Sequence, residues 1–402
     1  MGCDKRYGLR EVWVAPEASP NSPATFADTN YLYHCTGSTF PAVYREALDN
    51  GEATGTRGQS MPFYGAQNEL AWDVTVMCPA SSELATPASL PESLQSLFWA
   101  AGFGSDSGPS SWTPGQSGQV VMAVKAGSAC GRTIQLLGLD RDKRQLELLT
   151  GAVVSQVVLT FSRSDVCTIQ FSGVAAQKYE ATAPSIAVAD ISNTTFNAVV
   201  VSSFGMALPT SPAILTGVDL TLPGASSELA SINGSAGQIT LKADLSSSTI
   251  TATTQSYWAA PKDPSLAYDV LSPDGWSSSS AIAATQSATI TLETGQTYGE
   301  LTTAAQYPTE ILSGQAKVTA SATAYLVDSN MASSYRSSAG FSIYLLPGQT
   351  GTYFGIAAAR LTEAPAIDLS SVDTPASGDF SLQAGEDNTY SAYGFLDTLF
   401  VN

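Results

Sequence analysis

TGAVVSQVVLTFSRSDVCTIQFSG, residues Thr150–Gly173, is the most informative stretch of this 402-residue chain. It contains two runs rich in β-branched and aromatic residues, 155–163 and 166–174, in which apolar and polar side chains alternate. A period of two residues is typical of a strand that buries one face. The segment SRSD at 162–165 separates the two runs. The stretch therefore predicts two antiparallel strands joined by a tight turn.

The residues before this stretch continue the pattern. Runs at 132–139 and 144–151 are apolar and strand-like, and LDRDKR at 139–144 lies between them as a second predicted hairpin turn. Five charged residues follow one another there: Asp140, Arg141, Asp142, Lys143 and Arg144. Such a cluster indicates an exposed turn, because charged side chains are costly to bury. The more specific alternative is that this turn is a loop that contacts another subunit.

Strand signals also dominate the rest of the chain. We expect further strands at 8–16, 118–127, 214–222, 238–245, 249–259, 288–295, 316–327, 341–348, 353–362 and 393–401. SPDGW at 272–276 predicts a turn because of its Pro-Asp-Gly core. The predicted fold class is therefore mainly β.

One helix is expected in the first half, within LPESLQSLFWAAGFG at 90–104. Its apolar residues Leu90, Leu94, Leu97 and Phe98 recur at the spacing of one helical face. Pro91 suits the first turn of this helix, and Gly102 or Gly104 can end it. A weaker helix signal lies at 327–338.

These elements suggest a division of the chain into domains. Residues 1–180 form the expected first β domain, from which the glycine-rich segment 36–68 makes a long, weakly patterned excursion. Residues 181–213, rich in Ala, Ser, Thr and Pro, are expected to connect it to a second β domain at 214–402.

The hexapeptide ASSELA occurs twice, at 80–85 and 225–230, and raises the question of a duplication. Aligning the two copies puts a predicted helix opposite a predicted turn and strand. Matching strand-then-helix order instead puts 316–338 opposite the strand NELAWDVTVM at 68–77 and its helix. We favour this second register, in which the hexapeptide repeats by chance of composition.

The charge balance excludes some classes of function. The chain has 35 acidic and 17 basic residues, a net charge of −18, and only 13% charged residues. Residues 196–402 carry most of the excess, with 17 acidic and five basic residues. An acidic chain repels phosphate groups, so specific nucleic-acid binding is not expected.

The cysteines and the apolar runs point to an intracellular, non-membrane protein. The five cysteines, an odd number without CxxC spacing, are expected to be reduced thiols. The N-terminus lacks the apolar region of a signal peptide, and no apolar run is long enough to span a membrane.

The sequence contains no recognisable catalytic constellation. Its single histidine, His34, precedes Cys35, and adjacent side chains of a strand point to opposite faces. Phosphate-binding glycine motifs and metal-ligand spacings are absent. The acidic pairs Asp140 with Asp142 and Glu386 with Asp387 are better explained as turns or solvated faces. We expect no enzymatic activity, no cofactor and no metal.

The order of these elements resembles the tail tube (major tail) proteins of long-tailed bacteriophages. The resemblance rests on GLREVWVAPEASPNSPATF (8–26), NELAWDVTVM (68–77), SLPESLQSLFWAAGFG (89–104), the hairpin at 150–173 and FGIAAARLTEAPAIDLSS (354–371). It spans roughly 8–175 and 290–402. The second glycine of the family's hairpin motif is missing, since Val154 or Ser155 stands there.

The resemblance implies β-sandwich or barrel tube domains with one flanking helix each, which assemble into rings. The match of 316–338 to 68–77 favours two such domains in tandem, with three chains to a ring, and one tube domain with a decoration domain, with six chains to a ring, is the alternative. Trimeric or hexameric rings would stack into the tube that conducts DNA during genome ejection, with acidic side chains toward the bore. Its partners would be other copies of itself, the tape-measure protein, and the tail tip and terminator proteins. DNA would pass without specific binding, and no membrane would be involved. The protein would be made in the host cytoplasm and reside in the virion tail.

Two other classes of function stay open. A virion-surface or layer-forming β-rich adhesion protein would explain the Ser- and Thr-rich strands. A glycan-degrading enzyme would need two carboxylates across a cleft.

Overall fold

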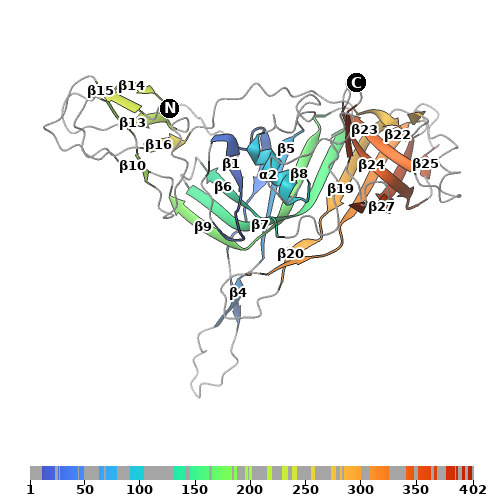
Figure 1. The fold of residues 1–402 in the computed structure, drawn as a ribbon, viewed down its shortest axis with the longest axis horizontal. Helices are drawn as coiled ribbons and strands as arrows, with labels where there is room; N and C mark the ends of the chain where they lie inside the picture. The colour runs from blue at the N-terminus through green and yellow to red at the C-terminus, as the bar shows by residue number, and fades with distance from the viewer. Residues whose placement is uncertain are drawn as a thin grey trace, which may run out of the picture.

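The computed structural model describes the protein as a mainly β molecule of antiparallel strands (Figure 1). The described residues are 11–22, 26, 28–43, 45–48, 63–67, 69–78, 91–103, 131–140, 145–162, 165–182, 185–187, 195–197, 199–201, 215–219, 229–233, 238–241, 255–258, 273–277, 281–282, 285–299, 308, 310–325, 341–347, 352–363, 366–368, 377–384, 386–387, 392–393 and 397–400.

The hairpin predicted at 150–173 is confirmed, but its first strand is much longer than expected. Strand β7 runs without a break over Gln145–Ser162, so the prediction of two separate strands at 144–151 and 155–163 is wrong. Gly151, with a φ of 62°, and a register shift between Val154 and Gln156 let the strand bend instead of ending. Strand β8 (Thr168–Ala175) follows the predicted turn.

β7 pairs with two different groups of strands along its length. Its first part pairs with β6 (Ile134–Asp140) on one side and β9 (Gln177–Thr182) on the other. Its second part pairs with β8. The β6–β7 pairing reaches Asp140 and Gln145, which confirms the predicted hairpin; residues 141–144 lie outside the described residues.

The remaining N-terminal strands attach to these two groups. β1 (Glu11–Pro16) pairs with β6, while β2 (Cys35–Thr39) pairs with β5 (Leu70–Met77), which pairs with β8. A short 3-10 helix, η1, spans Asp28–Asn30. β5 alternates strictly between buried and more exposed residues, as its sequence pattern predicts.

The predicted helix is confirmed as α2, Glu92–Ala100. Pro91 precedes it, and Gly102, with a φ of 100°, donates its N–H to the Trp99 carbonyl at the C-terminal end. Phe98 is fully buried and meets the Phe103 and Phe171 rings edge-on, at centroid distances of 5.4 and 5.2 Å. One buried cluster therefore joins α2 to β8, β1 and β5. The weaker helix predicted at 327–338 lies outside the described residues.

The excursion at 36–68 is more regular than expected. β2 occupies its start, and β3 (Arg45–Leu48) pairs antiparallel with β4 (Phe63–Gln67). β4 projects away from the sheets on the side where β20 (Gln296–Tyr298) also lies (Figure 1). These strands form although the sequence there is weakly patterned, because short strand pairs need little periodicity once a partner is adjacent.

The C-terminal half contributes the other part of the large sheet. In spatial order from β7 its strands are β19 (Thr285–Glu293), β22 (Lys317–Tyr325), β26 (Ser377–Ala384), β24 (Thr352–Leu361), β23 (Phe341–Pro347), β17 (Pro273–Ser277) and β18 (Ala281–Ile282). β25 (Ala366–Asp368) also pairs with β26, and β29 (Asp397–Phe400) with β24. Two further antiparallel pairs join β20 to β21 (Ile311–Ser313) and β27 (Glu386–Asp387) to β28 (Ala392–Tyr393).

The turn predicted at 272–276 is wrong, because Pro273–Ser277 form β17. Its pairing with β23 shifts register between Pro273 and Trp276. Such an irregularity accommodates the proline and glycine that would otherwise favour a turn.

Six pairings of the N-terminal half recur in the C-terminal half, in the same chain order and all antiparallel. They are β1–β6, β6–β7, β7–β9, β7–β8, β8–β5 and β5–β2, matched by β17–β23, β23–β24, β24–β29, β24–β26, β26–β22 and β22–β19. β22 thus takes the place of β5, which agrees with the favoured of the two sequence registers.

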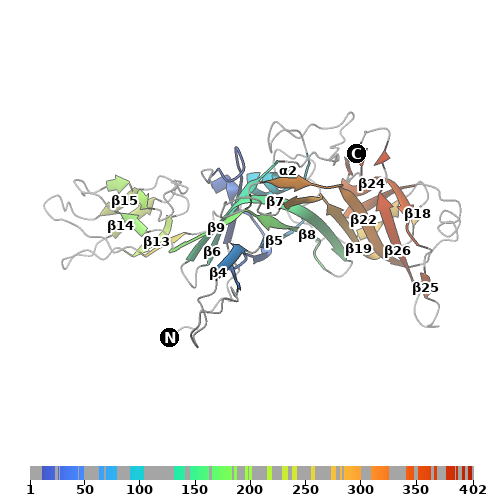
Figure 2. The same ribbon diagram turned by 90° about the horizontal axis from the view of Figure 1, so that it is seen from below.

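Residues between the halves form small sheets of their own at one end of the molecule (Figures 1 and 2). β10 (Ser185–Ala187) pairs with β12 (Val199–Val201), and β13 (Leu215–Asp219) with β16 (Gln255–Trp258). β15 (Gln238–Leu241) pairs with β11 (Thr195–Asn197) and β14 (Leu229–Asn233). The domain boundaries at 180 and 213 stay a prediction.

In the part of the chain that the structure describes, no helix is long and apolar enough to cross a membrane.

Candidate assembly surface

The two halves of the chain meet edge to edge between β7 and β19. Seven consecutive residue pairs align antiparallel, from Ser162 opposite Ser287 to Gln156 opposite Glu293. The large sheet therefore continues from β5 and β8 through β7 into β19, β22 and β26 (Figure 2). We call this joint the β7–β19 junction.

The inward face of the sheet is apolar across the junction. On β7, Val157, Leu159 and Phe161 are at most 1% exposed. On β19, Ala288, Ile290 and Leu292 are at most 2% exposed and belong to the same buried cluster. Because burial does not stop at the joint, its two strands are packed like the interior of a single unit.

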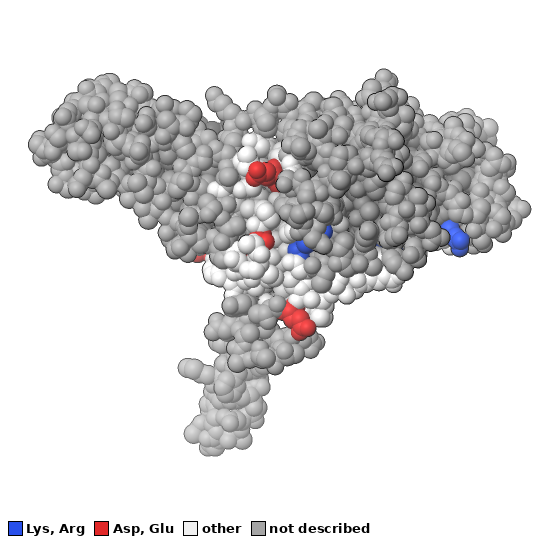
Figure 3. Space-filling model, in the orientation of Figure 1, with Lys and Arg blue, Asp and Glu red and all other residues white. Residues whose placement is uncertain are grey.

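The outward face of the same sheet is polar and carries few charges. One cross-strand row runs from Thr168 through Thr160, Thr289 and Ser321 to Ser381. The next row contains Gln170, Val158, Thr291, Thr319 and Gln383. Hydroxyl and β-branched side chains suit such a solvated sheet face. The described surface visible in Figure 3 is likewise mostly uncharged, with isolated acidic and basic side chains.

A polar clasp closes the end of the junction. It consists of residues 294–298, which leave β19 and enter β20, and their partners on the N-terminal half. The Thr294 hydroxyl donates to the Val154 carbonyl at 2.6 Å, and its N–H donates to the Ser155 carbonyl at 2.9 Å. In return the Ser155 hydroxyl donates to the Gln296 carbonyl at 2.8 Å. These bonds tie both strands at the bulge of β7.

The clasp reaches the helix and the bend of β7 as well. The Gln296 amide donates to the Ala100 carbonyl, at the C-terminal end of α2, at 3.2 Å. The Tyr298 hydroxyl donates to the Gly151 carbonyl, and burial raises the pKa of this phenol above its usual range. Tyr298 therefore stays neutral and acts as a hydrogen-bond donor.

The bend at Gly151 is built around the buried carboxylate of Glu17. This carboxylate accepts the Gly151 N–H at 2.8 Å and the Asn21 N–H at 3.0 Å. Burial raises the pKa of Glu17, and the two backbone hydrogen bonds offset part of that rise. A Cβ on residue 151 would lie 2.4 Å from the Asn21 Oδ1 and 2.8 Å from the Tyr298 hydroxyl oxygen. Only glycine fits this position.

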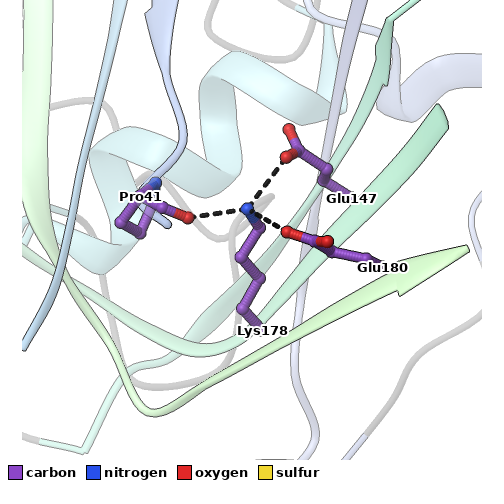
Figure 4. A network of polar contacts seen from close by, with 4 residues as sticks. All are labelled: Pro41, Glu147, Lys178 and Glu180. Atoms are coloured by element: carbon purple, nitrogen blue, oxygen red, sulfur yellow. Dashed lines mark hydrogen bonds and ion pairs between the residues drawn. The ribbon is translucent and has the colours of Figure 1, made fainter. Parts of the chain in front are cut away.

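A buried lysine holds β9 against β7 and the residues after β2 (Figure 4). The Lys178 ammonium lies 2.8 Å from a Glu147 carboxylate oxygen and 2.7 Å from one of Glu180, and it donates to the Pro41 carbonyl at 2.6 Å. The lysine and Glu147 side chains are nearly inaccessible. Two acids and a carbonyl compensate the charge, which indicates a structural ion pair.

Within the described part of the large sheet, two strands, β2 and β25, have a paired neighbour on one side only. Among the described residues, β2 pairs with β5 alone, and β25 pairs with β26 alone. Sheet edges of this kind are templates for pairing with another chain.

The residues selected from sequence lie largely elsewhere. Asp140 ends β6, while Arg141, Asp142, Lys143 and Arg144 lie outside the described residues, so the contact loop stays a prediction. Glu386 and Asp387 form β27. Within the described ranges, no group of three or more histidine, cysteine or acidic residues could hold a metal ion.

The described cysteines are thiols, and burial protects them. It raises the pKa of Cys35 to about 11 and that of Cys167 to about 12, and it raises the pKa of Cys78 well above the usual range. A high pKa suppresses the reactive thiolate. His34 has a φ of 52°, and its carbonyl accepts the Met77 N–H at 3.1 Å, so its backbone anchors the start of β2.

Sequence reasoning missed the clasp and the Glu17 centre. The available signals were Thr294-Gly295 at the end of a predicted strand and Gly151 inside a strand-like region. Neither signal names its partner, because Gly151 and Tyr298 are far apart in the chain.

Comparisons with known proteins assign no family to this chain. No protein-family model matches the chain, and no curated protein matches it.

Proposed function

We propose that the chain is a structural subunit of a bacteriophage tail tube, built from two tandem β-sandwich units that join edge to edge into rings. The β7–β19 junction carries this proposal. It joins two sets of strands with matching connectivity into one sheet, with a continuous apolar face on one side.

The matched pairings support the reading as tandem units. Each set has the same six antiparallel pairings in the same chain order. In the first unit, strands of both groups and α2 contribute to one buried cluster. That arrangement fits a sandwich with a flanking helix.

The polar face supports the role as a conduit. In the described part of this face, which consists mostly of Thr, Ser and Gln side chains, the basic residues are Lys317, opposite Glu293, and Arg360, opposite Gln383. Such a wall has little to hold phosphate groups. We therefore place this face toward the bore, with Asp73, Glu293 and Asp379 as its acidic members. The expected partners are other copies of the chain, the tape-measure protein, and the tip and terminator proteins.

Two units per chain favour trimeric rings with six units. The test is negative-stain electron microscopy of the concentrated protein, with light scattering for particle mass. We expect hollow tubes or stacked rings with the mass of three chains per ring. Rings of six chains would contradict the tandem reading, and flat sheets would favour a layer-forming protein instead.

A further inference from the structure

The β7–β19 junction is a template for a second joint, because the two halves share irregularities of register as well as strand order. β6 and β7 shift register after Ile134 opposite Ala152, and resume with Leu136 opposite Leu149. β23 and β24 shift at the corresponding place, between Phe341 opposite Ala359 and Ile343 opposite Ile356. Shared irregularities are stronger evidence of equivalence than shared strand order, since each is a specific backbone feature.

The same test identifies the counterpart of β19. In β2, Cys35 lies opposite Val76 and the pairing then shifts to Gly37 opposite Thr75. In β19, Thr285 lies opposite Ala324 and the pairing shifts to Ser287 opposite Thr323. Gly37, Ser38 and Thr39 thus occupy the positions of Ser287, Ala288 and Thr289.

The counterpart of the second part of β7 is β25. Pairing with β8 is interrupted after Val154 opposite Gly173, and pairing with β26 is interrupted after Leu361 opposite Leu382. Beyond the interruption, Thr160 lies opposite Thr168, and Asp368 lies opposite Ser377. The segment AID at 366–368 therefore takes the place of VLT at 158–160. In sequence, AIDLS at 366–370 repeats the alternation of apolar and polar residues found in VLTFS at 158–162.

We propose that β25 of one chain pairs antiparallel with β2 of a second copy, in the register of the β7–β19 junction. Thr160 lies opposite Thr289 in that junction, so Asp368 lies opposite Thr39 of the neighbouring copy. The inference rests on the proposed function for its ring geometry. Each chain offers one edge of each kind, so the contact is head-to-tail and closes into a ring when its rotation permits.

The joint between chains is the weaker of the two. In the register above, residues 294–298 (TGQTY), which form the clasp, correspond to 44–48 (YREAL). Residues 44–48 lack the threonine, glutamine and terminal tyrosine of the clasp, which bind Val154, Ala100 and Gly151 within the chain. The separate chain is thus a stable pair of units, and chains associate as their concentration rises.

The test uses paired cysteine substitutions at both joints of the full chain. Thr39→Cys with Asp368→Cys reports the joint between chains, and Thr160→Cys with Thr289→Cys is the matched control within a chain. Each variant is oxidised at low and high concentration and analysed by mass and by denaturing gel, with the unsubstituted chain in parallel.

We expect the control to cross-link within single chains at every concentration, which also reports correct folding. The Thr39→Cys, Asp368→Cys variant is expected to give covalent dimers and trimers only at high concentration. Mixing the two single variants is expected to give dimers at least tenfold more abundant than either alone, because the contact is head-to-tail. Moving the second cysteine to the position of Ile367 is expected to abolish the product.

Electron microscopy of the same samples separates this inference from the proposed function. Tubes without the cross-link between positions 39 and 368, while the control cross-links, overturn the register and leave the tube intact. Covalent trimers that form neither rings nor tubes support the register and overturn the tube. Uncross-linked monomers at the highest soluble concentration overturn both.

Discussion

At the scale of single residues, Gly151 combines a left-handed backbone conformation with a crowded environment. Its positive φ redirects β7 from one group of strands to the other, and three side chains crowd the space where a Cβ would lie. Its N–H and carbonyl bind residues from distant parts of the chain, Glu17 and Tyr298. One residue thus connects the N-terminal segment, the bend and the second half.

Gly151→Ala is expected to destabilise the protein by about 2–5 kcal/mol, from left-handed backbone strain together with overpacking. Gly131→Ala is the matched control, since Gly131 also has a positive φ, 77°, but nothing lies within 4 Å of the position that a Cβ would take there. The control should cost about 1–2 kcal/mol, from strain alone. Denaturant unfolding measures both values, and equal losses would contradict the role given to the crowded contacts.

Glu17→Gln is expected to reduce the dependence of stability on pH. Burial raises the pKa of Glu17, so the folded state binds its proton more tightly than the unfolded state does. The resulting stabilisation is complete below the unfolded pKa and is lost as pH rises through the folded pKa. Unfolding of both proteins between pH 4 and pH 8 measures this difference. A variant with the same decline as the parent would show that another group titrates.

At the scale of elements, the two faces of β19 differ in what their side chains contribute to the joint. Ile290 is 1% exposed in the shared core, whereas its neighbour Thr291 belongs to the outward polar row. Backbone pairing is common to both residues, so side-chain burial is the difference between them.

Ile290→Ala is expected to cost about 2–5 kcal/mol, through lost burial and a residual cavity. Thr291→Ala is expected to cost about 1 kcal/mol or less, since it removes only a partly exposed side chain with good strand propensity. Chemical denaturation of the two variants provides the comparison. Similar losses would mean that the apolar face does not hold the junction.

At the scale of the whole molecule, the continuous sheet couples the stability of the two halves. β8 and β22 lie on opposite sides of the junction, and both contribute to the cluster that contains Leu159 and Ile290. Local opening at the joint therefore exposes strands of both halves.

Hydrogen exchange is expected to reveal this coupling. Ile290→Ala should accelerate exchange in β8 as well as in β22, relative to the parent chain and to Thr291→Ala. Mass spectrometry of peptides from both strands measures the effect. Acceleration confined to β22 would indicate that the halves open independently.

The sequence by itself determined the local elements. Alternation predicted β8, β22 and β24, and helical spacing with Pro91 and Gly102 predicted α2, because burial of one face imposes these periods on any partner. Element order also predicted that β22 corresponds to β5, which the strand pairings support, while the rest of that register, 326–338, lies outside the described residues.

Only the tertiary structure decided the continuity of β7, the strand at 273–277, the junction and the clasp. A period of two residues identifies a strand but does not identify its neighbours, since the same pattern fits many partners. Ser162 lies opposite Ser287, and Glu17 binds Gly151, through contacts between distant parts of the chain. Those contacts depend on how the whole chain packs, and no local pattern records them.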